Sequence, residues 1–456
     1  MSSVRSGQDP ASAHTRISPT TIVLVGLMLF AMFFGAGNLI FPPQLGVEAG
    51  SLFAPAMLGF LTTGVLLPAL AVIAVALSGS GIDDMAARAG RWFGLVFPVL
   101  IYLAIGSLYG IPRTATVAYE IGVAGATGAE GRLPLLAFTV VFFAVTLWLV
   151  LRPGGVLQAL GRWLTPALLM LVVALVVGAT IRLSSVGPMK PSPKWADSPV
   201  TTGVLEGYLT MDSLAALVFG IVVISALRAE GADAAGTGQG GIGRAASIAA
   251  LFAAGLLAAV YLGLGHVARL VDSEASNGAA LLADVALATF GPAGVWIFGG
   301  IVMLACLTTA VGLVSANAVF FARVAPVLGY RTWAVVFAVA GLLVANLGLE
   351  TIIAAAVPLN IFLYPMAVTL VLVTLAQAVV PWELRWTYRG AIAVAAVFAL
   401  VDLLRTLDVD PARSVPWLGA LPLYEQSLSW VLPVALTAVG CAVVDASARR
   451  RTERTA

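Results

Sequence analysis

The residues best suited to bind a charged solute lie where the first apolar segment of the chain is interrupted. There, Gly35, Gly37 and Asn38 are followed by a pair of prolines, and this combination disfavours a continuous helix. The half-helix resuming near residues 36–39 would present free N–H groups and a positive dipole end to a carboxylate. The half-helix ending near residues 31–34 would present free carbonyls to an ammonium group or a cation. The alternative is a proline kink that serves packing alone.

A carboxylate lies inside the sixth apolar segment, in the run from Gly207 to Ser213. An ionised acid at membrane depth is costly unless it is paired or solvated. Asp212 is therefore predicted to be an ion ligand, a proton carrier or an anchor for a second break. Arg113, in the third segment, is expected to gate the outer pathway or to pair with Asp212 or Glu120. The alternative is that Arg113 and Asp212 form an ion pair that serves structure alone.

Two hydroxyls lie in the eighth segment, where Ala305, Thr308 and Thr309 are spaced i, i+3 and i+4 and so share one helix face. Hydroxyl and carbonyl oxygens are hard ligands of the kind that Na⁺ takes. The signal is weak alone, because threonine in membrane helices usually bonds back to its own backbone. We find no Ser/His, paired-acid or metal-ligand pattern in the sequence, which predicts that the protein is not an enzyme.

Composition indicates which elements must position these groups. Hydrophobic residues make up 60% of the 456 residues and charged residues 10%, against about 45–50% and 25% in soluble domains. The chain is therefore predicted to be an all-α integral membrane protein, and a net charge of +2 argues against nucleic acid as a partner. Apolar runs separated by Gly, Pro and charges give about 12 transmembrane helices. They are 20–46, 52–77, 92–123, 134–151, 162–183, 203–228, 243–268, 293–321, 331–348, 352–379, 388–406 and 427–446.

Basic residues set the expected orientation. With the N-terminus inside, most of the 24 lysines and arginines fall in cytoplasmic connections, as the positive-inside rule requires. Both termini are therefore predicted to be cytoplasmic. The expected division is an N-terminal tail at 1–19, one transmembrane domain at 20–446 and a basic C-terminal tail at 447–456.

Several strings stand in one order along nearly the whole chain. They are Phe34 to Pro43 with Gly46 and Ala49-Gly50, Pro112 to Val117, Gly207 to Asp212, Ala305 to Leu307 with Thr309 to Leu313, Asn346 to Leu349, and Tyr364-Pro365. Together they resemble the bacterial branched-chain amino acid:cation symporters. The resemblance implies uptake of leucine, isoleucine and valine, coupled to Na⁺ or, in some members, to H⁺, across the bacterial inner membrane.

The resemblance also implies an architecture and an ion site. The architecture is the leucine-transporter-like 5+5 inverted repeat, with broken helices 1 and 6 and two additional helices. The sodium site would combine Ala305, Thr308 and Thr309 with carbonyls near Ala31 and Phe34. No cofactor is implied beyond Na⁺ as the coupling ion.

The resulting hypothesis is a secondary symporter that works by alternating access. The substrate carboxylate would meet N–H groups near the first break, and its ammonium group would meet carbonyls from both breaks. The predicted substrate-binding residues are Phe34, Gly35, Ala36, Gly37, Asn38, Tyr109, Met211, Asp212 and Phe219. Among them, the apolar pocket would be formed by Phe34, Tyr109, Met211 and Phe219.

Three alternatives remain at this point. The first is an H⁺-coupled carrier, which Asp212 keeps open, and the others are a channel and a nutrient sensor that use the same site without turnover. The expected surroundings are the lipid bilayer, with no obligate protein partner.

Overall fold

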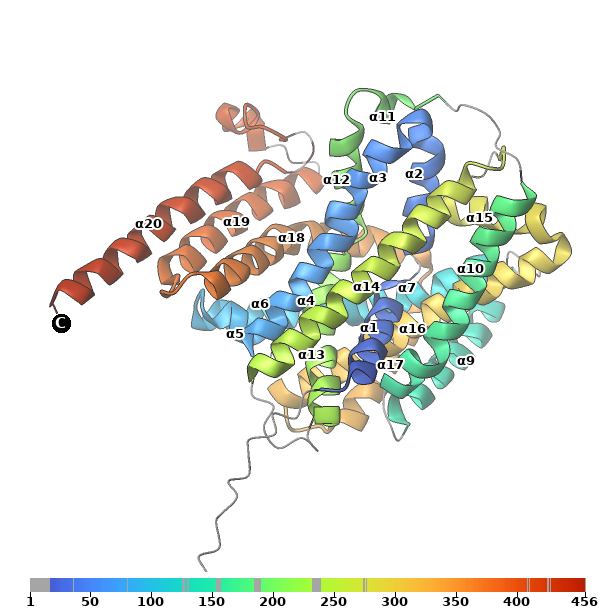
Figure 1. Ribbon diagram of the computed structural model, residues 1–456, viewed down its shortest axis with the longest axis horizontal. Helices are drawn as coiled ribbons and strands as arrows, with labels where there is room; N and C mark the ends of the chain where they lie inside the picture. Colours follow the sequence, from blue (N-terminus) through green and yellow to red (C-terminus); the bar gives the residue numbers. More distant parts are fainter. Residues whose placement is uncertain are drawn as a thin grey trace, which may run out of the picture.

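The regular structure of this chain is helical throughout the described residues, in which no strand occurs (Figure 1). The computed structural model describes residues 17–35, 37–79, 81–124, 128, 131–152, 157–183, 190–231, 239–273, 275, 277–407, 409, 411–424, 426 and 428–455. Ala36 and most of the predicted N-terminal tail lie outside these residues. The predicted all-α class is confirmed.

The first five predicted segments all fall on helices, several of them interrupted. The first helix begins at Pro19, whose fixed φ suits a helix start, and Ser18 caps it by accepting a hydrogen bond from the Thr20 N–H at 3.2 Å. The elements in order are α1 Pro19–Phe33, η1 Gly37–Leu39, α2 Phe41–Ala49, η2 Gly50–Leu52, α3 Phe53–Leu61, η3 Thr62–Leu66, α4 Leu67–Ser78, α5 Ile82–Ala87, α6 Arg91–Leu103, η4 Ala104–Leu108, α7 Gly110–Val117, η5 Ala118–Ala124, α9 Arg132–Leu151, η6 Leu157–Leu164 and α10 Thr165–Arg182.

The later segments likewise fall on helices. The longest helix among them that was not predicted is α15, an apolar element of 13 residues; the short α11, η7 and η8 were not predicted either. Asn277 caps the start of α15 by accepting from the N–H groups of Ala279 and Ala280. The elements are α11 Pro193–Ala196, α12 Pro199–Leu209, α13 Asp212–Gly231, α14 Gln239–Ala268, α15 Gly278–Phe290, α16 Pro292–Val324, α17 Tyr330–Ala345, α18 Leu349–Val379, α19 Arg385–Thr406, η7 Pro411–Arg413, η8 Pro416–Leu418 and α20 Val431–Thr455.

Three of the apolar segments are broken in mid-course. Helix α1 ends at Phe33 and the chain resumes as η1, while α12 ends at Leu209 and α13 begins at Asp212. The third break was not predicted. Between α6 and α7 the helix widens into the π-helix η4, where Gly106 departs from helical geometry with φ −79° and ψ −112°. Single-turn π-bulges of this kind are frequent at functional sites.

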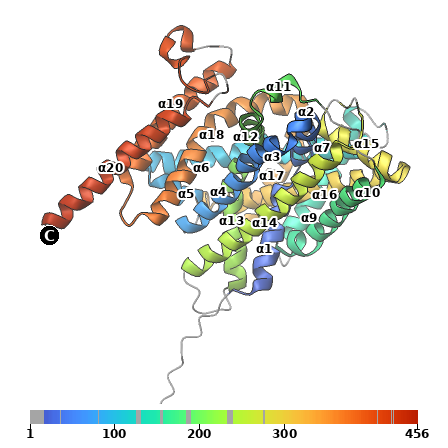
Figure 2. The same cartoon turned by 45° about the horizontal axis from the view of Figure 1, so that its top comes forward.

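The broken helices lie at the centre of the bundle. Helix α1 packs against α13, α14 and α16, and glycines allow close approach elsewhere: a Cβ on Gly46 would meet the Gly265 carbonyl oxygen at 2.2 Å. By contrast, α20 lies at the edge and packs against α19, which packs against α18 (Figures 1 and 2).

Among the described residues, ten helices are long and apolar enough to cross a membrane. Three shorter apolar helices, α1, α15 and α17, fall below that length. The protein is therefore a multi-pass membrane protein, and its central helices are the ones that are broken.

Candidate functional site

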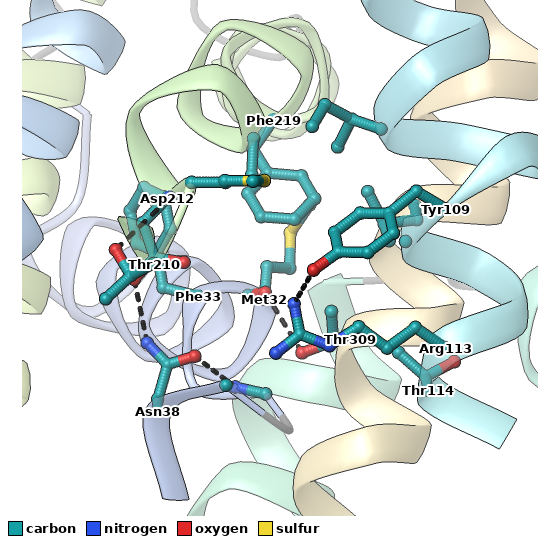
Figure 3. A pocket seen from close by; sticks show the side chains of 17 residues that line it. Met32, Phe33, Asn38, Tyr109, Arg113, Thr114, Thr210, Asp212, Phe219 and Thr309 are labelled. Carbon is teal, nitrogen blue, oxygen red and sulfur yellow. Dashed lines mark hydrogen bonds between the residues drawn. The ribbon is translucent and has the colours of Figure 1, made fainter. Parts of the chain in front are cut away.

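A cavity of about 70 Å³ lies between the breaks (Figure 3). Its walls come from the end of α1, from η1, from η4 and α7 with the turn between them, from the α12–α13 break with the first turns of α13, and from α16. The predicted residues that line it are Gly35, Gly37, Asn38, Tyr109, Met211, Asp212, Phe219 and Thr309. The structure thus brings together in one place residues that the sequence spreads over nearly 300 positions.

The first break is closed by its own asparagine. The Asn38 N–H donates to the Gly35 carbonyl at 3.2 Å, and the Gly35 N–H donates to the Asn38 side-chain oxygen at 3.3 Å. These two bonds replace the helical pattern that ends when the Phe34 N–H donates to the Phe30 carbonyl. The asparagine is therefore the residue that satisfies the interrupted backbone.

The same asparagine joins the first break to the second. Its Nδ2 donates to Asp212 Oδ2 at 2.8 Å and also to the Tyr261 hydroxyl, which in turn donates to Asp212 Oδ2 at 3.3 Å. All three side chains are buried, with Asp212 only 6% exposed. Asp212 is thus held by neutral hydrogen-bond donors from η1 and α14, which satisfy a buried carboxylate without a counter-ion.

Arg113 is separate from this triad. Among the described residues, Arg113 and Asp212 form no ion pair, so the alternative of a salt bridge between them is not what the structure has. The guanidinium group instead donates to the Tyr109 hydroxyl, and its carbon lies 5.1 Å from the centre of that ring. It also lies against the first break, because a Cβ on Gly37 would be 2.7 Å from Arg113 Nη2. The cavity therefore has a cation on one wall and a carboxylate on another (Figure 3).

The apolar wall differs in one residue from the prediction. Phe33 lines the cavity and meets Phe219 edge to face, with ring centres 5.6 Å apart. The Phe34 side chain was predicted to line it, but it is not among the lining residues; it stacks on Phe30 one turn earlier, with ring centres 5.5 Å apart. Because α1 is apolar on all sides, the sequence does not indicate which of two adjacent phenylalanines faces inward.

The oxygens of the predicted sodium site converge where α1 meets α16. The Thr308 hydroxyl donates to the Ala31 carbonyl at 2.9 Å and to the Ala305 carbonyl at 3.0 Å. The Thr309 hydroxyl donates to the carbonyl of Met32 at 3.1 Å. Thr308 therefore bonds back to its own helix, as threonine in membrane helices usually does, and it also bonds across to α1.

The Phe34 carbonyl takes part in none of these contacts. Unwound backbone carbonyls at the end of a broken helix are groups that coordinate Na⁺ where such helices form ion sites in membranes. Among the described residues, no cluster of three or more His, Cys, Asp or Glu side chains forms an alternative metal site.

The sequence reasoning missed several members of the site, chiefly Tyr261, Met32, Phe33 and Thr210. Tyr261 lies in the long apolar helix α14 and is fully buried. A buried tyrosine hydroxyl usually finds a partner, so a lone tyrosine in a long apolar helix was the available signal. Met32 contributes only its carbonyl to the contact with Thr309, which no side-chain pattern reveals.

Comparisons with known proteins show the family to which the chain belongs. Residues 18–448 match the family described as branched-chain amino acid transport protein. The chain is 46% identical to the branched-chain amino acid permease BrnQ of Corynebacterium glutamicum, over 94% of this chain and 96% of that protein. It is 40% identical to the branched-chain amino acid transport system 2 carrier protein of Pseudomonas aeruginosa, over 94% and 97% of the two chains.

Solved structures show the fold. Mhp1, a nucleobase-cation-symport-1 family transporter, in a closed conformation with bromovinylhydantoin bound, is similar with a TM-score of 0.57 at 15% identity, over 97% of this chain and 96% of that chain. Its inward-facing conformation gives a TM-score of 0.53 at 14% identity, over 98% and 96%. The family and these relatives are transport proteins rather than enzymes, as the sequence predicted. This chain belongs to the branched-chain amino acid transport protein family.

Proposed function

We propose that this protein imports leucine, isoleucine and valine as a secondary active symporter that alternates access to one central site. The observation that carries the proposal is the pair of helix breaks that face one cavity and are joined by the Asn38–Asp212 hydrogen bond. Interrupted helices at the bundle centre are how secondary transporters build sites for substrates and ions. The names of the family and of its relatives give the substrate class.

The cavity offers complementary groups to an amino acid. The substrate carboxylate would meet the backbone N–H groups near Gly37 and, beside them, the Arg113 guanidinium. The ammonium group would meet free carbonyls of the two breaks. Phe33 and Phe219 would cover the aliphatic side chain. Such a wall separates leucine from valine weakly, because one methylene is worth only about 1–3 kcal/mol.

Na⁺ is the proposed coupling ion. It would lie between α1 and α16, held by the Thr308 and Thr309 hydroxyls and by carbonyls that include those of Ala31 and Ala305. The support is that these oxygens already approach one another within hydrogen-bond distance. The ion would couple to the substrate because both bridge the broken α1 to the rest of the bundle, and so favour the same conformer. No cofactor is proposed.

A second candidate is coupling to H⁺. It is favoured by Asp212, a buried carboxylate that lines the substrate cavity and has no ion-pair partner among the described residues. In that case Asp212 would carry the coupled proton, and the Asn38 amide would remain its partner in both protonation states.

The finer architecture that we propose is twelve crossings, with the first ten related as a 5+5 inverted repeat and both termini cytoplasmic in the inner membrane. Its support is that a helix falls on each predicted segment, that the first and sixth are broken, and that Mhp1 shares the fold. The two added helices would be α19 and α20, which lie beyond α18 at the edge of the bundle (Figure 1).

The test is uptake of labelled leucine into proteoliposomes with Na⁺ and pH gradients imposed separately. Accumulation above the external concentration under an inward Na⁺ gradient alone supports the symporter, and it excludes both a channel and a sensor. Uptake that needs only the pH gradient selects H⁺ coupling. Equilibration without accumulation under either gradient contradicts the proposal.

A further inference from the structure

A second cavity, remote from the substrate site, opens at the end of the bundle where the turn between α18 and α19 lies beside α5 (Figure 1). It measures about 610 Å³ and is predominantly polar. Three arginines, Arg88, Arg385 and Arg389, line it together with one carboxylate, Glu383. Nothing in the proposed transport mechanism uses this cavity.

The three arginines have no acidic partner in the part of the chain that the structure describes. Within it, no carboxylate lies within ion-pair distance of any of the three guanidinium groups, Glu383 included. Arg88 instead donates to the Tyr388 hydroxyl at 3.3 Å, and Arg389 lies 5.9 Å from the centre of the Trp386 ring. With its three arginines and Glu383, the cavity lining carries a net charge of +2. No described carboxylate pairs with these arginines.

The floor of the cavity is held in a fixed shape. Gln377 ties the turn together, because its Nε2 donates to the Trp382 carbonyl at 2.8 Å and its Oε1 accepts from the Leu384 N–H at 2.7 Å. Asp445 of α20 caps α19 by accepting from the N–H groups of Trp386 and Thr387, both at 3.0 Å. These N–H groups at the start of α19 are thus already used, so a bound anion would be held by the arginine side chains.

The surroundings match a membrane interface. Trp386 is 52% exposed at the rim, and Trp382 lies under the Arg449 guanidinium, 5.8 Å from the centre of its ring. Tryptophan and arginine gather where helices leave the hydrocarbon layer. Planar guanidinium groups match the geometry of phosphate oxygens, and basic pockets between membrane helices take lipid headgroups.

We propose that this cavity binds the phosphate headgroup of an anionic phospholipid, with Arg385 and Arg389 as its main ligands and Arg88 as a third. The lipid would seat α18, α19 and α5 against one another at the edge of the bundle. A soluble phosphate compound has the same charge chemistry but would draw nothing from the exposed Trp386 beside the site. The lipid is therefore the assignment.

The test compares lipids on the purified full-length protein by native mass spectrometry. Detergent-solubilised protein is mixed with equal amounts of phosphatidylglycerol and phosphatidylcholine, and the lipid retained by each protein ion is counted. We expect selective retention of phosphatidylglycerol. Because a charge-assisted hydrogen bond contributes about 1.5–3 kcal/mol, the double variant R385Q/R389Q should lose that retention by about tenfold or more. R331Q, which removes an arginine outside the cavity, is the matched control and should retain it.

Three outcomes overturn the proposal. The first is equal retention of the two lipids by the unaltered protein, a measurement that does not depend on any variant folding. The second is phosphatidylglycerol retention that survives in R385Q/R389Q and R88Q. The third uses inorganic phosphate, which is added to the lipid-free protein and to the protein with phosphatidylglycerol bound. If phosphate raises the melting temperature of the first and displaces the lipid from the second, the site binds soluble phosphate and the lipid assignment is wrong.

Discussion

The two breaks that bound the substrate cavity are built in different ways. In the first, neither Gly35 nor Gly37 has a positive φ. A Cβ on Gly35 would lie 2.8 Å from Oγ1 of the short Thr309 side chain, whereas a Cβ on Gly37 would meet only the movable end of Arg113. In the second, Met211 has φ 62°, a left-handed conformation that costs a non-glycine residue about 1–2 kcal/mol. The first break thus depends on the missing side chain at Gly35 and on the Asn38 side chain that satisfies the freed backbone. The second depends on a strained backbone at Met211 that side-chain hydrogen bonds hold in place.

The largest effect should come from filling the first break. In Gly35→Ala the new methyl group would lie 2.8 Å from Oγ1 of Thr309, a short, half-buried side chain that is held by its hydrogen bond to the Met32 carbonyl. Overpacking of this kind costs about 1–3 kcal/mol, so leucine uptake should fall by up to ~100-fold. Gly255→Ala in α14 is the control, since no neighbouring atom lies within 4 Å of the place that its new methyl group would take. Equal uptake by both variants would show that the space at Gly35 has no function.

The next effect tests the link between the breaks. Asp212→Asn keeps the shape of the side chain but replaces the charged acceptor of the Asn38 and Tyr261 hydrogen bonds. Loss of charge-assisted bonds worth about 1.5–3 kcal/mol each should lower uptake by roughly tenfold or more. Tyr261→Phe should cost less, because it removes a neutral donor only. If Asp212→Asn abolishes pH-driven uptake and leaves Na⁺-driven uptake intact, the carboxylate carries a proton and is not needed as the link.

A third change removes one oxygen of the proposed ion site. Thr309→Ala should lower the apparent affinity for Na⁺ by about tenfold, comparable with losing one bond to a charged group, whereas Thr309→Ser keeps the hydroxyl and should stay close to the unaltered protein. Thr180→Ala, whose hydroxyl bonds within α10, is the control. The measurement is leucine uptake against Na⁺ concentration. An unchanged Na⁺ dependence in Thr309→Ala would refute the ion assignment.

The smallest effect concerns strain in the second break. Met211→Gly and Met211→Ala both remove the side chain from the cavity wall, but only glycine relieves the left-handed backbone. Met211→Gly should therefore be more stable than Met211→Ala by about 1 kcal/mol, seen as a higher melting temperature in detergent. A Met211→Ala variant that melts at or above Met211→Gly would mean that the break is not strained.

Prediction from sequence succeeded where local chemistry dictates the backbone. The first break follows from its glycines, asparagine and prolines, and the second from an acid in an apolar run; both lie where expected. The break at Gly106 was missed because a single glycine in an apolar segment is ordinary, and what accompanies it is tertiary: a Cβ there would meet the Asn317 side-chain oxygen of α16 at 2.5 Å. Helix α15 was missed because 13 residues are too short to register as a span.

The sequence by itself determined that this is a multi-pass helical membrane protein interrupted at its first and sixth segments, because hydropathy and helix breaking act through neighbouring residues. Only the tertiary structure decided which groups meet. It paired Asp212 with Asn38 and Tyr261 instead of Arg113, turned Phe33 and not Phe34 toward the cavity, and brought the Thr308 hydroxyl to the Ala31 carbonyl. The physical reason is that a helix which is apolar on every side has no hydrophobic stripe to indicate which face is buried against its neighbours. Its packing partners are therefore selected only when the helices assemble.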